Sequence, residues 1–125
     1  MGQIVKITCA SCKSEWKCKT GCGILHGDLE RVAQLYLPEQ CRKITDYAKQ
    51  TEYPLFSFEY GLSWCPYCNH IGSVPVLRLE DENISYLGAC EHCMKEVSLI
   101  DSLENVECPV CHQRKLTQEI DGMWD

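Results

Sequence analysis

Four pairs of cysteines, each spaced Cys-x-x-Cys, are the residues of this chain best suited to chemistry. They are Cys9/Cys12, Cys65/Cys68, Cys90/Cys93 and Cys108/Cys111. Two thiols spaced in this way sit on one tight turn, a zinc knuckle, from which both sulfurs reach the same metal ion. Because a structural zinc ion binds four protein ligands, the four knuckles predict two closed Zn²⁺ sites per chain with all eight cysteines as ligands.

Disulfide bonds are the main alternative for a chain with 11 cysteines. Disulfide scaffolds belong to oxidising compartments. The sequence opens with Met-Gly-Gln and shows no apolar signal segment, and no apolar run approaches the roughly 20 residues that span a bilayer. We therefore expect a cytoplasmic protein that does not enter a membrane and whose paired cysteines bind metal.

The spacing also suggests which knuckles share an ion. Only 14 residues separate Cys93 from Cys108, enough for two antiparallel strands, so we predict that the last two knuckles form one zinc ribbon. The first two knuckles would then form the other ribbon across the 52 residues between Cys12 and Cys65. Loop closure permits this, because its entropic cost grows only logarithmically with length.

A competing assignment stays open. In it Cys18 and Cys22 join the first knuckle in one compact site and the second knuckle joins the third, which leaves Cys108/Cys111 without partners. A third zinc ion is also possible, with Cys18, Cys22, Cys41 and His26 as ligands. The simpler interpretation is that Cys18 and Cys22 are free thiols and that Cys41 is a small apolar residue on a helix.

Three further histidines, His70, His92 and His112, lie beside or within the knuckles. Each could replace a cysteine as a ligand. Because four sulfurs are already available at each site, we expect these side chains to face solvent or to hydrogen-bond a neighbour.

The elements that must position the knuckles are mostly short strands. Hydrophobic alternation and turn residues predict strands at residues 3–8, 14–18, 55–64, 72–79, 84–87, 94–100 and 115–120. Helical periodicity appears only within about residues 24–50. There Asp28 can cap a helix that carries Leu29, Val32, Ala33 and Tyr36 on one face, Pro38 ends it, and a second helix follows with Cys41, Ile44 and Ala48 on one face.

We therefore predict a small α+β protein of two zinc ribbons, the first interrupted by a helical insert. The acidic turn at residues 80–83 divides a first domain, residues 1–80, from a second, residues 84–125. With 45% hydrophobic but only 9% aromatic residues in 125, neither half can build a large core. A structural zinc site supplies on the order of 10–16 kcal/mol, so we expect folding to depend on the metal.

The knuckles Cys65-Pro66-Tyr67-Cys68 and Cys108-Pro109-Val110-Cys111 resemble those of the rubredoxin-like zinc-ribbon superfamily. The whole chain is similar to small bacterial proteins with two ribbons, a helical insert in the first and a Gly-x-x-Trp-Asp tail, here residues 122–125. The resemblance implies metal-stabilised ribbons and no particular activity, because ribbons serve in transcription, translation, metal handling and as accessory domains.

Charge favours a protein partner. The net charge is −6, and residues 61–125 carry 11 acidic side chains against 4 Lys and Arg. Such a chain is poorly suited to phosphate backbones. We expect a non-catalytic interaction or adaptor module, in which Trp124 either anchors a partner or folds back over the second ribbon, the one predicted from the last two knuckles.

Two alternatives remain from the sequence. The first is nucleic-acid binding through the cluster of cations around Trp16, namely Lys6, Lys13, Lys17 and Lys19. The second is a rubredoxin-like iron electron carrier, since four thiolates also bind iron. We expect no enzyme, because four cysteines close a zinc shell to water and the chain contains no phosphate-binding loop, nucleophile elbow or deaminase signature.

Overall fold

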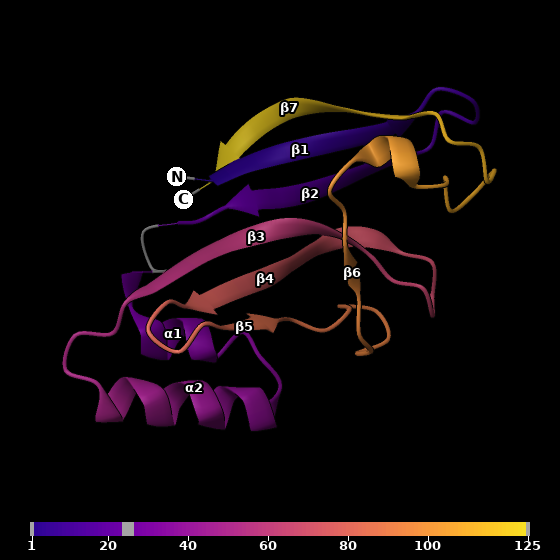
Figure 1. Ribbon diagram of the computed structural model, residues 1–125. Helices are drawn as coiled ribbons and strands as arrows, with labels where there is room; N and C mark the ends of the chain where they lie inside the picture. The colour runs from indigo at the N-terminus through magenta and orange to yellow at the C-terminus, as the bar shows by residue number, and fades with distance from the viewer. Residues whose placement is uncertain (1, 24–26, 125) are drawn as a thin grey trace.

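The computed structural model describes residues 2–23 and 27–124 and shows an antiparallel sheet with two helices at one end (Figure 1). No helix in this described part is long and apolar enough to cross a membrane. The strands are β1 (Gly2–Cys9), β2 (Glu15–Gly21), β3 (Phe56–Trp64), β4 (Ile71–Leu79), β5 (Ile84–Leu87), β6 (Ser98–Leu99) and β7 (Leu116–Trp124). The helices are α1 (Leu29–Ala33) and α2 (Pro38–Gln50), and a 3-10 turn lies at Leu103–Asn105.

The sheet consists of two halves. Its strand order is β5-β4-β3-β2-β1-β7, with β6 paired to the end of β3. β2 pairs with β3 only where Gly21 meets Tyr60, whereas β1 pairs along its whole length with both β2 and β7. The upper half in Figure 1 is therefore β2-β1-β7 and the lower half is β5-β4-β3.

The helices lie between β2 and β3 in the chain and cover the lower half. Asp28 caps α1 by accepting a hydrogen bond from the backbone N–H of Glu30, as its position in the sequence predicts. Pro38 starts α2, where its missing N–H costs nothing. The apolar faces of the helices pack on β3 and β4 in one core, whose buried members are Leu29, Val32, Ala33, Tyr36, Ile44, Tyr47, Phe58, Leu77 and Leu79.

A second core joins the two halves near the cysteine knuckles. Val5, Ile7 and Cys18 of the upper half pack with Ile71 of the lower half, and partly buried Trp16 and Trp64 lie against them. Apolar burial of this kind contributes roughly 25 cal/mol for each Å² removed from water. Because it contains residues of both halves, this second core fixes how they meet.

Several predicted elements differ from the observed ones. The strand expected at residues 94–100 shortens to β6, because the knuckle extends to Lys95, whose carbonyl accepts a hydrogen bond from the N–H of Cys90. The strand expected at residues 115–120 extends to Trp124, since β1 offers it a partner from Cys9 back to Gly2. The expected domain boundary at residues 80–83 is the turn between the paired strands β4 and β5, and β7 pairs with β1, so the sheet does not divide there.

Trp124 is built into the sheet. Its indole N–H donates to the carbonyls of Gln3 and Thr20, at 3.1 and 3.2 Å. Its ring lies over Gly2, where a Cβ would collide with it, and packs edge to face on Tyr60 at a centroid distance of 5.5 Å. Of the two predicted roles for Trp124, the structure therefore supports folding back, although onto β1 and β2 and not onto the last two knuckles.

Replacing Trp124 by alanine should lower the free energy of unfolding by about 1–2 kcal/mol, because two hydrogen bonds and part of an aromatic ring are lost. Urea denaturation of the metal-loaded protein measures this. Met123→Ala is the matched control, since the Met123 side chain is exposed on the same strand and its loss should cost less than about 0.5 kcal/mol. Equal effects of the two changes would show that the contacts of Trp124 with β1 and β2 do not stabilise the sheet.

Candidate metal centres

The four knuckles share one backbone structure. In each, the N–H of the first cysteine donates to the carbonyl five residues later, and its carbonyl accepts from the N–H four residues later. The partners are Ser14 and Lys13 for Cys9, His70 and Asn69 for Cys65, Lys95 and Met94 for Cys90, and Gln113 and His112 for Cys108. The same turn is thus made four times from different sequences.

A left-handed residue closes each turn. Lys13, Asn69, Met94 and His112 have φ between 58° and 67°, and each lies four positions after the first cysteine of its knuckle. Glycine adopts this conformation without strain, whereas other residues pay for it. None of the four is glycine, so the chain tolerates a conformational cost at every knuckle.

The knuckles combine into two groups of four cysteines that could hold a metal ion. One group is Cys9, Cys12, Cys108 and Cys111, and the other is Cys65, Cys68, Cys90 and Cys93. We call them site 1 and site 2. Within each group the sulfurs lie within 4.8 Å of one another, and two sulfur pairs in each group that join its two knuckles are 3.4–3.6 Å apart. A tetrahedron with metal–sulfur bonds of about 2.3 Å has edges of roughly 3.8 Å, so this spacing suits one ion at each site.

This pairing corrects the one predicted from the sequence. The last two knuckles do not share a site, and neither do the first two. β7 returns along β1 and places Leu116 opposite Cys9, which brings the last knuckle beside the first. For the last knuckle, the nearest knuckle in the sequence, Cys90/Cys93, was therefore the wrong partner. The competing assignment correctly paired the second knuckle with the third but wrongly left the last one without partners.

The remaining cysteines form no metal-sized cluster among the described residues. Cys18 is buried in the core shared by the halves, where burial raises the pKa of its thiol to about 11. Cys41 packs against the helical core, as predicted for a small apolar residue, and Cys22 is exposed. His26, the fourth predicted ligand of a third site, lies outside the described residues.

The thiols of the two groups differ in their affinity for protons. Hydrogen bonding to Ser14 lowers the pKa of Cys12 to about 6. Burial works against ionisation of Cys65, but hydrogen bonds from the backbone N–H groups of Cys68 and Tyr67 and from the thiols of Cys93 and Cys68 together outweigh it and lower its pKa to about 6. Burial raises the pKa of Cys108 to about 11. A metal ion must therefore displace protons from the group, and its affinity should fall as the pH is lowered.

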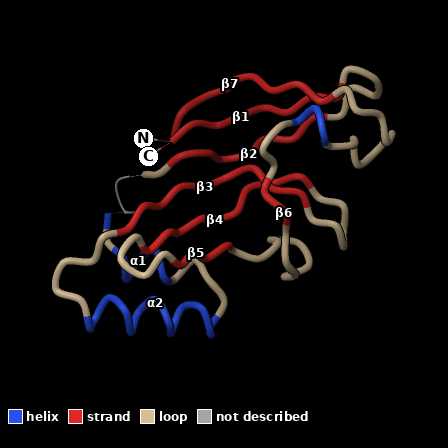
Figure 2. The backbone as a smooth tube through the Cα atoms, in the orientation of Figure 1, coloured by secondary structure: helices blue, strands red, loops and turns tan. Residues whose placement is uncertain are grey.

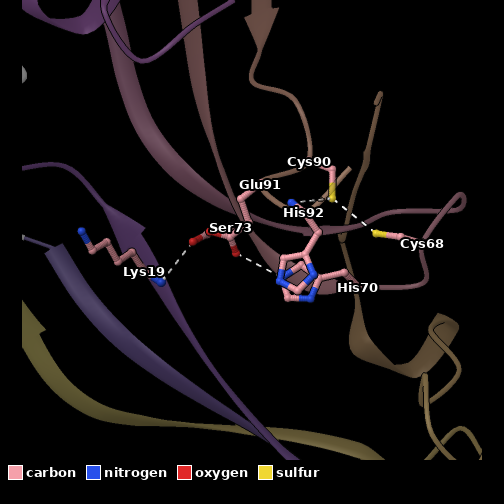
Figure 3. Close-up of polar contacts among 7 residues, drawn as sticks. All are labelled: Lys19, Cys68, His70, Ser73, Cys90, Glu91 and His92. Atoms are coloured by element: carbon pink, nitrogen blue, oxygen red, sulfur yellow. Dashed lines mark hydrogen bonds and ion pairs between the residues drawn. The ribbon is translucent and has the colours of Figure 1, made fainter. Parts of the chain in front are cut away.

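Site 2 lies where the two halves of the sheet touch (Figure 3). The His70 ring stacks on that of His92 at 3.8 Å, and its Nε2 lies 3.1 Å from a carboxylate oxygen of Glu91. Beside them the N–H of Lys19 on β2 donates to Ser73 Oγ on β4 at 3.2 Å. The contacts of His70 link the second knuckle to the third, and the Lys19–Ser73 bond links the two halves of the sheet. Neither histidine belongs to the metal-sized groups found among the described residues.

The two sites are also linked to each other. The side-chain amide of Asn69, in the second knuckle, donates to the carbonyl of Pro109 in the last knuckle at 3.3 Å. The indole N–H of Trp64 donates to the same side chain through Asn69 Oδ1 at 2.7 Å. Figure 2 shows the loops that carry the knuckles at the end of the sheet away from the helices. Asn69 thus joins site 1 to site 2 at that end, a role that its sequence position alone did not signal.

Chemically, each group offers four sulfurs and no nitrogen or oxygen ligand. An ion held by all four would have a closed shell, with no position for water or substrate. No protein-family model, curated protein or solved structure matches this chain.

Pairs of cysteine variants should report the connectivity. Starting from an expected two ions per zinc-loaded chain, Cys9→Ser and Cys108→Ser should each remove one ion, and combining them should still remove only one, because both change site 1. Combining Cys9→Ser with Cys65→Ser should remove both ions. Native mass spectrometry counts the ions. The opposite pattern would restore the pairing predicted from the sequence.

The left-handed residues give a second test. Met94→Gly should be more stable than Met94→Ala by about 1 kcal/mol, because only glycine adopts the positive φ of 64° without strain. Met123 is the matched control, since it lies in an extended strand where alanine should be the more stable by about 0.5–1 kcal/mol. Chemical denaturation of the four variants measures both differences. The same order at both positions would contradict the left-handed turn.

Proposed function

We propose that this protein is a zinc-stabilised, non-catalytic module that binds another protein. The observation that carries the proposal is the composition of the two sites, each of which is surrounded by four cysteine sulfurs. A metal ion with such a shell holds chain segments together and does no hydrolytic chemistry. The shared knuckle structure supports the related proposal that the chain is built from zinc knuckles of the rubredoxin-like kind.

The negative net charge of the chain supports binding to a basic partner. The chain has a net charge of −6 before any metal is counted. Each zinc ion held by four thiolates would add two further negative charges, because four anionic sulfurs surround a divalent cation. Opposite charge on a partner speeds association and favours the correct orientation.

Nucleic-acid binding is the second candidate. A hollow of about 500 Å³ is lined by Trp16, Lys17, Lys19 and Tyr60, a mixture suited to stacking and phosphate contact. The cations are already engaged, however. Lys17 pairs with Asp121 at 3.2 Å, and the Lys19 ammonium lies over the rings of Tyr60 and Trp124. A lysine paired with a carboxylate gains less from phosphate, so this candidate has weaker support.

An iron-dependent electron carrier is the third candidate, since tetrahedral sulfur ligands accept iron as well as zinc. Backbone N–H groups of His92 and Val110 point at the sulfurs of Cys90 and Cys108 at 3.4 Å, and such bonds tune iron sites and zinc sites alike. The purified protein would be red if iron were the native metal. A colourless protein with two zinc ions supports the structural role.

Removing the metal tests the structural role directly. Chelation at neutral pH should abolish the cooperative thermal transition followed by circular dichroism, because the cores alone are too small to hold the two halves. Adding zinc back should restore the transition. An unchanged melting curve in the metal-free protein would reject the proposal.

Selection from a random peptide library then tests the binding role. The zinc-loaded protein should enrich a peptide consensus, and the chelated protein should not. Binding of a mixed single-stranded oligonucleotide at low salt, with no peptide enriched, would favour the nucleic-acid candidate instead.

A further inference from the structure

A hollow of about 560 Å³ lies between the start of α2, strand β5 and the loop that carries the third knuckle. Its apolar lining consists of Leu37, Leu87, Ala89, Met94 and Val97. Leu37 and Met94 are 36% and 57% exposed, so their apolar surface meets water. This size lies within the range of sites that take a small ligand or a few side chains of a peptide. We call it the β5 groove.

Strand β5 brings an open row of backbone groups to this groove. It is the last strand of the lower half, paired only with β4. Gly88 N–H donates to Pro75, so in this antiparallel ladder Tyr86 also faces β4, whereas Ser85 and Leu87 face outward. The carbonyl of Leu87 accepts from the side chain of Gln40 at 3.2 Å, which agrees with this direction. No described residue bonds the outward N–H groups of Ser85 and Leu87.

The charge at the groove is negative. Glu39 and Glu96 belong to its lining, and no described residue that lines it carries a positive charge. Glu39 pairs only with Lys43 of its own helix, at 3.7 Å between exposed side chains. Lys95 is next to Glu96 in sequence, but its ammonium lies over the ring of Tyr67, 4.9 Å from the centroid. Glu96 has no ion pair among the described residues, and Glu39 is held only by this long pair between exposed side chains, which a cation from a partner can replace.

We propose that the β5 groove binds an extended segment of a partner protein in which basic and apolar residues alternate. The segment adds a strand to β5 through the outward N–H and C=O of Ser85 and the outward N–H of Leu87, since the C=O of Leu87 already accepts from Gln40. Its apolar side chains enter the groove, and its Lys or Arg side chains meet Glu39 and Glu96. This inference deepens the proposed function, on which it rests, by naming the surface and the chemistry of the partner.

A synthetic peptide of about eight residues in which Lys alternates with Val, labelled with fluorescein, is the probe. We expect it to bind the zinc-loaded protein in fluorescence polarisation, whereas a peptide in which Glu alternates with Val should not. Amide hydrogen exchange locates the contact. The amides of Ser85 and Leu87 should exchange at least about tenfold more slowly with the peptide present, whereas Tyr86, already bonded to β4, should change little.

Two kinds of variant test the two interactions separately. Glu39→Gln combined with Glu96→Gln should weaken binding by about tenfold, because both carboxylates are neutralised. The pair Glu59→Gln with Glu104→Gln is the matched control, which changes the net charge equally at exposed acids outside the groove. Ser85→Pro removes one outward N–H and should also weaken binding, with metal content and melting temperature unchanged.

The outcomes separate this inference from the proposed function. If library peptides bind but ignore the groove variants, the module stands and the groove is rejected. If the Lys/Val peptide binds equally to both pairs of glutamine variants, attraction is general and the groove is also rejected. A dimer in sedimentation equilibrium that Ser85→Pro abolishes would assign the edge to a second copy of the chain and overturn the proposed occupant.

Discussion

The pairing of β7 with β1 is the constraint on which the rest of the structure depends. It joins the last nine described residues to the first strand in one ladder, from Gly2 opposite Trp124 to Cys9 opposite Leu116. That ladder carries the last knuckle back to the first, creates site 1 and leaves the two middle knuckles to form site 2. A metal ion at site 1 would therefore stabilise a contact between the two ends of the sequence, where chain entropy opposes folding most.

Much of the local structure could be predicted from the sequence, because it depends on neighbours. Alternating apolar residues gave the strands that became β3 to β5, and Asp28 marked the start of a helix. The Cys-x-x-Cys spacing identified all eight cysteines of the two groups. These features follow from turns and periodicity within about ten residues of the chain.

The pairing of the knuckles could not be predicted in the same way. All four make the same turn, so nothing in their own residues selects a partner, and the choice follows from strand order in the sheet. Two of the left-handed residues were equally hidden, because Lys13 and Met94 are not residue types that signal a positive φ. Asn69 and Trp64, which join the two sites, gave no signal either.

The cysteines of site 2 all lie between the two halves of site 1 in the sequence. In sequence order, one metal centre is thus nested inside the other. During synthesis on a ribosome, the inner centre has its complete donor set once Cys93 has emerged, whereas the first knuckle waits for Cys108 and Cys111. The nested order therefore leaves the thiols of Cys9 and Cys12 as the longest exposed to oxidation or to a wrong partner.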